Sequence, residues 1–193
     1  MKGEPGTFGP YRLLAGAVVP RPIAWVSSRS AAGVDNLAPY SFFNVVAVDP
    51  PVLMFAPVGT GGDLKDTPRN VLDTGEFVVN VVTADLAERM NETSASLPSG
   101  ESEFDRADLA KAEAEWVNAA RVADAKISFE CRLYDSIEVG GSTMILGEVV
   151  YAHVDDEVTT GGKLDVTKLD AVGRLSGSHY ATTRDRFAME RPP

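Results

Sequence analysis

The chain has 193 residues, a length that suits one well-packed domain, and 44% of them are apolar. Its formal net charge of −10 argues against broad binding to nucleic acid or to an anionic membrane surface. No stretch approaches the roughly 18 uninterrupted apolar residues that a membrane span requires. The single cysteine, Cys131, excludes disulfides within the chain, and the first residues contain no apolar core of signal-peptide length. We therefore expect a cytoplasmic protein.

Strand signals dominate the N-terminal part of the chain. The last of them, FVVNVV, does not alternate, so we expect a strand that is buried on both faces, in which Asn80 bonds to backbone groups. Pro50 and Pro51 separate two of the strands because proline cannot continue a ladder. The predicted strands span residues 22–28, 40–48, 52–57 and 77–82.

Helical signals follow in the middle of the chain. Thr67 with Pro68 predicts a helix that starts with a threonine cap and ends at Gly75. Asp85 with Glu88 three residues later predicts a second helix. Residues 94–103 form a polar loop, and we expect a strongly charged helix over residues 105–116.

A long hairpin is predicted after residue 126. Apolar and polar residues alternate from Ile127, and residues 143–154 form the partner strand after a Gly-Gly-Ser turn. Gly147 inside that strand predicts a bulge or a close backbone approach. With no repeat and no linker, residues 1–193 are expected to form one mainly β (α+β) domain. We expect a closed or split antiparallel barrel with peripheral helices.

Several common chemistries lack support. His153 and His179 have no partners at metal-ligand spacing, so no metal site is expected. The serine of Gly173-Arg174-Leu175-Ser176-Gly177 stands one position too late for a nucleophile elbow. We assign no catalytic side chain, and hydrolase and metalloenzyme hypotheses have little support.

Two polar segments favour a different chemistry. Residues 20–44 predict a strand, a turn and a strand whose ends carry hydroxyl and amide groups, which suits a phosphate beside a flat aromatic ligand such as a flavin. A helix starting near Thr67 directs free N–H groups outward, and Lys65 adds a positive charge. From local sequence alone, ordinary capping by Thr67 with a solvated Lys65 is the favoured explanation of the second segment.

Five motifs appear in register in the first part of the chain: PRPIAWVS (20–27), NLAPYSFFN (36–44), DPP (49–51), KDT (65–67) and GEFVVN (75–80). Two C-terminal segments follow, GRLSGSHY (173–180) and DRFAMERP (185–192). Together they resemble the flavin reductase-like family of FMN-binding split barrels, which includes flavoredoxin-type proteins. Departures from the family pattern lie mainly in residues 58–63 and 94–118, which leaves the substrate specificity open.

The resemblance implies an antiparallel split barrel that forms a homodimer, with FMN near the subunit interface. It implies an FMN-dependent oxidoreductase that takes electrons from NAD(P)H and passes them to a second acceptor, such as an acceptor protein or a monooxygenase. Because the cofactor carries this chemistry, no side chain need act as acid or base. The residues that it assigns to FMN are Ser27, Asn36, Leu37, Ala38, Tyr40, Ser41, Ala56, Pro57, Lys65, Asp66 and Thr67.

Two other functions stay open at this point. The first is a non-catalytic FMN-binding electron carrier that is reduced by a protein partner. The second is a split-barrel domain that binds another ligand or serves as an interaction module. The absence of a dinucleotide-binding fingerprint keeps the first alternative open.

Individual residues leave further alternatives. Trp25 is expected in the core instead of against the flavin. If residues 40–48 form one strand, Tyr40 and Ser41 face opposite sides, and we expect the Ser41 side to meet the phosphate. Arg21 suits a surface position or a phosphate contact equally. His179 and Tyr180 either shape the nicotinamide side of the pocket or form a packed surface turn.

Overall fold

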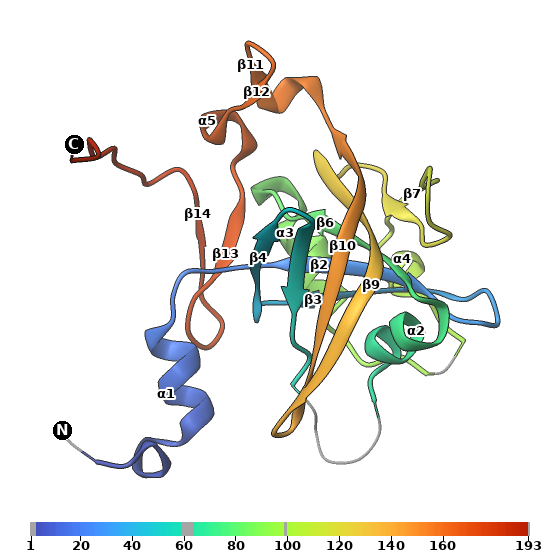
Figure 1. The fold of residues 1–193 in the computed structure, drawn as a ribbon, viewed down its shortest axis with the longest axis horizontal. Coiled ribbons are helices and arrows are strands. Elements are labelled where there is room, and N and C mark those ends of the chain that lie inside the picture. The colour runs from blue at the N-terminus through green and yellow to red at the C-terminus, as the bar shows by residue number, and fades with distance from the viewer. Residues whose placement is uncertain (1–2, 59–63, 99, 193) are drawn as a thin grey trace.

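The computed structural model describes residues 3–58, 64–98 and 100–192. Residues 59–63, in one of the segments that depart from the family pattern, lie outside the described residues. Seven antiparallel strands form the main sheet (Figure 1). In spatial order they are β3 (Asp35–Tyr40), β2 (Ala24–Arg29), β6 (Glu76–Val81), β9 (Ile127–Val139), β10 (Ser142–Val154), β5 (Pro51–Phe55) and β4 (Phe43–Val48).

The connection between the two edge strands forces this sheet to curl. β3 and β4 lie at opposite edges of the sheet, yet only Ser41 and Phe42 join them. Three Cα–Cα steps span at most about 11 Å, so the two edges must come together. A backbone bond from Ala56 N to Phe42 O at 2.8 Å ties the connection to the end of β5. The sheet is therefore a barrel.

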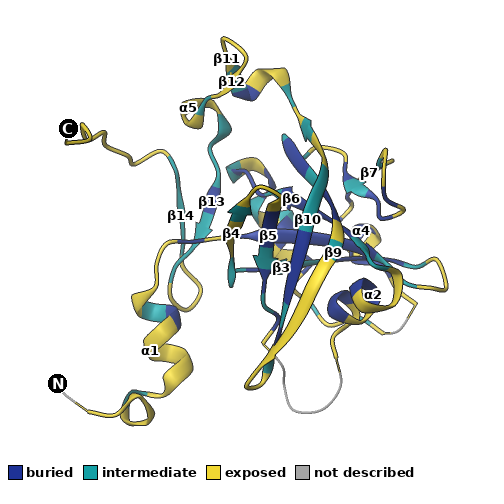
Figure 2. Cartoon of the chain, in the orientation of Figure 1, coloured by how far each residue is buried: buried dark blue, intermediate teal, exposed yellow. Residues whose placement is uncertain are grey.

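The barrel has an inner core and an outer core. The inner core packs Phe55 between Tyr40 and Phe77, with ring centroids 5.1 and 5.4 Å apart. The outer core lies around Trp25, which is fully buried as predicted and donates from Nε1 to Thr93 at 2.9 Å. Figure 2 shows that burial is concentrated in the middle of the barrel, while one end of the long β9 strand is exposed.

Gly147 explains how the barrel accommodates the bulky Phe77. The β9–β10 register shifts between Leu146 and Gly147. A Cβ on Gly147 would lie 2.2 Å from Cζ of Phe77. Both predicted features, the bulge and the close approach, are thus present at this residue.

The remaining elements surround the barrel. Arg21 donates to the carbonyls of Ala15 and Leu175, so α1 and the β13–β14 hairpin lie side by side at one flank of the barrel (Figure 1). Small sheets are formed by β1 (Arg21–Pro22), β13 (Val172–Arg174) and β14 (Tyr180–Thr182), by β7 (Lys111–Ala112) and β8 (Arg121–Val122), and by β11 (Thr159–Thr160) and β12 (Lys163–Leu164). The helices are η1 (Pro5–Phe8), α1 (Pro10–Ala17), α2 (Asp66–Thr74), η2 (Ala84–Leu86), α3 (Ala87–Glu92), α4 (Glu103–Arg106), η3 (Asp156–Val158) and α5 (Val166–Leu169).

The predicted helix over residues 105–116 is wrong. Helix α4 ends at Arg106, and the chain continues into the β7–β8 hairpin. The buried carboxylate of Glu130 accepts from the N–H groups of residues 115, 116 and 117, and Glu76 accepts from the N–H of residue 118. Tertiary contacts therefore take the N–H groups at the end of the predicted helix, and the β7–β8 pairing takes residues 111–112, so both override the local helix propensity.

Two local expectations also change. Residues 40–48 are not one strand, because β3 ends at Tyr40 and the chain bends at residues 41–42. The strand alternation therefore does not decide which side of the sheet Ser41 faces. Helix α2 begins at Asp66 with Lys65 at the cap position, and the Thr67 hydroxyl does not cap it. In the described part of the chain, no helix is long and apolar enough to cross a membrane.

Candidate functional site

A cleft with a volume of about 490 Å³ lies where β3, the start of α2 and the segment after α3 meet. It brings together residues from two predicted segments that are far apart in the sequence. Six of the eleven predicted cofactor residues line it: Asn36, Ala38, Tyr40, Lys65, Asp66 and Thr67. The sequence motifs NLAPYSFFN and KDT therefore meet at one cavity.

The period of β3 explains which of its residues reach the cleft. Asn36, Ala38 and Tyr40 alternate with Leu37, which is buried in the outer core instead. Successive side chains of a strand point to opposite faces, so these three share the face that meets the cleft, and Pro39 also borders it. Burial raises the pKa of the Tyr40 phenol, and the negative charges of Glu103 and Asp66 add to this effect. Tyr40 is consequently a neutral phenol at physiological pH.

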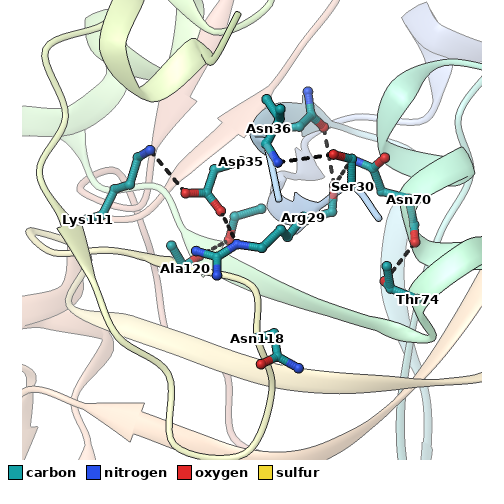
Figure 3. Close-up of polar contacts among 12 residues, drawn as sticks. Arg29, Ser30, Asp35, Asn36, Asn70, Thr74, Lys111, Asn118 and Ala120 are labelled. Atoms are coloured by element: carbon teal, nitrogen blue, oxygen red, sulfur yellow. Dashed lines mark hydrogen bonds and ion pairs between the residues drawn. The ribbon is translucent and has the colours of Figure 1, made fainter. Parts of the chain in front are cut away.

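A buried amide joins β3 to α2 beneath the cleft. Oδ1 of Asn36 accepts a hydrogen bond from Oγ1 of Thr67 at 2.6 Å. The same oxygen accepts from Ser28 at 3.4 Å, and Ser28 accepts from Nδ2 of Asn70 at 3.1 Å. Figure 3 shows Asn36 and Asn70 directed toward each other across this cluster. These bonds hold the start of α2 against the barrel.

Glu103 closes the same cluster from the other side. Its Oε2 accepts from Nδ2 of Asn36 and from the backbone N–H of Leu37, each at 2.9 Å. Burial raises the pKa of this carboxyl, and the nearby charge of Asp66 acts in the same direction; the donors only partly offset them. A carboxylate that is 6% exposed therefore lines a cleft with few groups to neutralise it.

The exposed Lys65 supplies a positive charge at the rim of the cleft. It occupies the N-cap position of helix α2, whose first N–H groups have no partner within the helix. Arg69 does not add a free charge here, because it donates to Asp66 at 2.9 Å and to the carbonyl of Leu64 at 2.6 Å. The rim at Lys65 thus offers donors, while the floor near Glu103 carries a negative charge.

The other five predicted cofactor residues do not line this cleft. Ser27 is buried and donates to the carbonyl of Ala120 at 2.5 Å. Ser41 lies in the bend and accepts from Nε of Arg21 at 3.4 Å. Leu37 lies in the outer core, and Ala56 and Pro57 follow the end of β5. Their assignment to FMN stays a prediction.

Two further candidates lie away from the cleft. Tyr180 donates from its hydroxyl to Asn91 at 3.2 Å and contacts Arg174, while His179 is exposed on the β13–β14 turn. Arg21 is buried, so the surface alternative is wrong; its guanidinium donates to the carbonyls of Ala15, Val18 and Leu175, and a phosphate contact stays a prediction. The expectation that His179 and Tyr180 form the nicotinamide side stays a prediction.

The structure adds cleft residues that the sequence did not single out. Residues 93–97 and Glu103 form one wall, and Pro39 and Leu64 complete the lining. The sequence shows residues 94–103 only as a polar loop, and nothing in it distinguishes Glu103 from the exposed Glu101. The one available signal is that this loop departs from the family pattern.

A second polar cluster lies beside the cleft on the other side of the β2–β3 hairpin. Asp35 bridges Nε of Arg29 at 2.7 Å and Nζ of Lys111 at 3.0 Å (Figure 3). Burial alone would raise the pKa of Asp35, but the two cations outweigh it and hold that pKa below its usual value. This triad fixes the β7 segment to the hairpin.

The family follows from a comparison with known proteins. Residues 16–168 match the model of the family described as flavin reductase like domain. The chain belongs to this family. An uncharacterized protein of Aquifex aeolicus is 44% identical over 173 residues, which cover 88% of each chain. An uncharacterized protein of Bacillus subtilis is 40% identical over 190 residues, covering 94% of this chain and 93% of the relative.

Solved structures agree with this membership. Nitrilotriacetate monooxygenase component B from Bacillus cereus is 35% identical, with a TM-score of 0.94 over 98% of both chains. A 2-nitrobenzoate 2-nitroreductase from Pseudomonas fluorescens is 32% identical, with a TM-score of 0.89 over 100% of this chain and 96% of that one. Flavoredoxin of Desulfovibrio vulgaris is 20% identical, with a TM-score of 0.79 over 89% and 91%. The predicted mainly β split barrel with peripheral helices is therefore confirmed.

Proposed function

We propose that the protein is an FMN-binding oxidoreductase whose cofactor occupies the cleft between β3, α2 and residues 93–97. One observation carries the proposal: two motifs assigned to FMN from sequence, around residues 36–40 and 65–67, meet at one cleft of about 490 Å³. This volume is within the range of about 300–1,000 Å³ that is usual for small-molecule sites. Membership of the flavin reductase-like family supports the choice of a flavin.

The residues that line the cleft fit the parts of FMN. Lys65 and the free N–H groups at the start of α2 suit the phosphate. The hydroxyl and carboxylate oxygens of Thr67 and Glu103 suit a hydroxylated chain, and Ala38 and Leu97 offer apolar contact to a ring.

The bound flavin would supply the redox chemistry, taking electrons from NAD(P)H and passing them to a second acceptor. The protein's own residues bind, orient and shield. Lys65 anchors one end of the ligand, Tyr40 stays neutral and packs against the inner core, and the segment 93–97 covers one side of the cleft. No side chain has to carry a proton in this scheme.

The names of similar structures support two kinds of acceptor. One similar protein is a monooxygenase component, and another is a nitroreductase. We favour a partner monooxygenase that receives electrons from reduced flavin, because the monooxygenase component has the higher identity and TM-score of the two. A nitroaromatic compound as direct acceptor is the alternative that the same assays would reveal.

The surface supports a homodimer. Strand β4 exposes Val45, Val46 and Val48, the last of which is 85% exposed, and helix α1 exposes Tyr11 and Leu14. Apolar side chains gathered on an edge strand and an adjoining helix are typical of a protein–protein interface. Sedimentation equilibrium is expected to give twice the monomer mass; a monomer at micromolar concentration would contradict this.

The test of the function begins with the absorption spectrum of the purified protein, before and after FMN is added and excess flavin removed. We expect a flavin spectrum with one FMN per chain. Oxidation of NADH and NADPH is then followed with and without free FMN. A bound flavin without nicotinamide turnover would favour the electron-carrier hypothesis, and a protein that stays colourless would contradict FMN binding altogether.

A further inference from the structure

A chain of three buried side chains runs beneath the cleft from α4 to α2. Glu103 accepts from Nδ2 of Asn36 at 2.9 Å, and Oδ1 of Asn36 accepts from Oγ1 of Thr67 at 2.6 Å. The exposed fractions of the three are 6%, 8% and 1%, and all three line the cleft. The order of hydrogen-bond donors and acceptors along these three side chains determines which donors or acceptors remain for a ligand at the cleft floor.

The direction of these bonds is fixed by Glu103. An ionised carboxylate has only acceptors, so the amide nitrogen of Asn36 must face it. The amide oxygen then faces Thr67 and Ser28, as the bonds from both hydroxyls show. A second bond to Glu103 comes from the backbone N–H of Leu37 at 2.9 Å, so the carboxylate cannot rotate freely.

The orientation of Asn36 determines how the Thr67 hydroxyl can bind a ligand. Its hydroxyl has one proton, which it donates to Asn36, so it can offer a ligand only its lone pairs. Together with the negative charge of Glu103, this makes the floor of the cleft an acceptor surface. A ligand group that donates hydrogen bonds fits there, and a phosphate dianion does not.

We propose that Glu103 is a positioning residue that orients Asn36 and Thr67 so that the cleft floor accepts hydrogen bonds from the hydroxyls of the ribityl chain and keeps the phosphate at the Lys65 rim. This inference rests on the proposed function, because it assumes that a flavin occupies this cleft. It assigns the hydroxyl of Thr67 to the ribityl chain instead of to the phosphate.

The test compares FMN with riboflavin, which lacks the phosphate. Binding of each to the full-length chain is measured by quenching of flavin fluorescence at pH 8. Glu103→Gln keeps one oxygen for both Asn36 and Leu37 and replaces the charged carboxylate by a neutral amide, whereas Glu103→Ala removes the charge and the acceptor. Glu101→Gln, on the same loop but outside this cleft, is the matched control.

The two variants have different expected results. Glu103→Gln should leave the affinity for riboflavin within about twofold of wild type. It should increase the affinity for FMN about threefold, because a negative charge that repels the phosphate is removed. Glu103→Ala weakens riboflavin about tenfold, the scale of one lost hydrogen bond, and weakens FMN less. Thr67→Val weakens riboflavin similarly, and the double variant is no weaker than either single one because the residues act through one chain.

Two results would overturn the proposal. If Glu103→Ala weakens the binding of FMN and of riboflavin by the same factor, and Glu103→Gln changes the affinity for neither, Glu103 has only a structural role. If the effects of Glu103→Ala and Thr67→Val are additive, Glu103 does not act through Thr67. If Glu103→Ala does not fold, the Glu103→Gln comparison decides alone. Failure of the wild-type chain to bind either flavin is a separate result, because it overturns the proposed function and this inference with it.

Discussion

Two buried clusters in this protein are each built around a glutamate, and they differ in how many donors bond to its carboxylate. In one, far from the cleft, Glu130 accepts from three backbone N–H groups and contacts the ring of His153 at 2.6 Å. In the other, Glu103 has two donors and lines the cleft. Both carboxylates are buried, but the pKa of Glu130 is lowered and that of Glu103 is raised.

The number of donors explains the difference. Burial acts first on both groups and raises the pKa of each, as expected when a charge leaves water. At Glu130 the N–H groups and His153 outweigh this effect; at Glu103 the donors do not, and Asp66 adds a like charge. A saturated buried carboxylate holds the fold together, whereas an unsaturated one at a cleft has capacity left for a ligand.

The largest expected effect comes from breaking the saturated cluster. Glu130→Ala should lower the free energy of unfolding by about 3–5 kcal/mol, because it leaves several buried N–H groups without an acceptor. Urea denaturation measures this change. The matched control is Glu115→Ala, which changes an exposed side chain on the segment that donates to Glu130 and keeps its backbone N–H; it should stay within about 0.5 kcal/mol of wild type.

This prediction separates fold from function. The folded Glu130→Ala protein should bind FMN with wild-type affinity at low temperature, since the Glu130 cluster does not line the cleft. If Glu130→Ala lowers the free energy of unfolding by less than about 1 kcal/mol, this cluster does not make a large contribution to the stability of the fold.

The next effect concerns the cleft. Lys65→Ala should weaken FMN binding by about 1–3 kcal/mol, the scale of a charge-assisted hydrogen bond, and should leave riboflavin binding nearly unchanged. Lys163→Ala, an exposed lysine on β12, controls for the change in net charge. Equal losses for FMN and riboflavin would place the phosphate elsewhere.

The smallest effect is a difference in pH dependence. A raised pKa at Glu103 means that its ionisation costs stability, and the cost grows as the pH rises from the ordinary value of 4.5 through the folded-state pKa. Glu103→Gln removes this cost, so its free energy of unfolding relative to wild type should increase over that range.

Glu130 should show the opposite sign. Its lowered pKa contributes stability above pH 4.5, which is lost as the pH falls through the folded-state pKa. The deficit of Glu130→Gln relative to wild type should therefore shrink in acid. Urea denaturation between pH 3.5 and 8 measures the free energy of unfolding of both variants relative to wild type. If the two differences change with pH in the same direction and by the same amount, the two carboxylates do not differ as we describe.

The sequence predicted much of the barrel because local patterns and tertiary packing agree there. The two-sided burial of the strand around Asn80 and the bulge at Gly147 follow from unbroken apolar runs and from a glycine inside a strand. The backbone bonding expected for Asn80 is confirmed by contacts to the carbonyl of Trp25 and the N–H of Val122, at 3.0 and 3.1 Å.

The sequence could not predict the wall of the cleft or the segment that follows it. Residues 105–116 have strong helix formers, but the carboxylate of Glu130, more than ten residues away in sequence, accepts from the N–H groups of the last two of them. Likewise, nothing local marks Glu103 as the partner of Asn36, 67 residues away. Such contacts follow from the closure of the barrel and not from propensity.

A crystal structure of the FMN complex tests the central claim most directly. Our account predicts FMN in the cleft between β3, α2 and residues 93–97, with the phosphate at Lys65 and a ribityl hydroxyl donating to Thr67 or Glu103. FMN bound elsewhere on the chain, or bound here with its phosphate on the Glu103 floor, would contradict it.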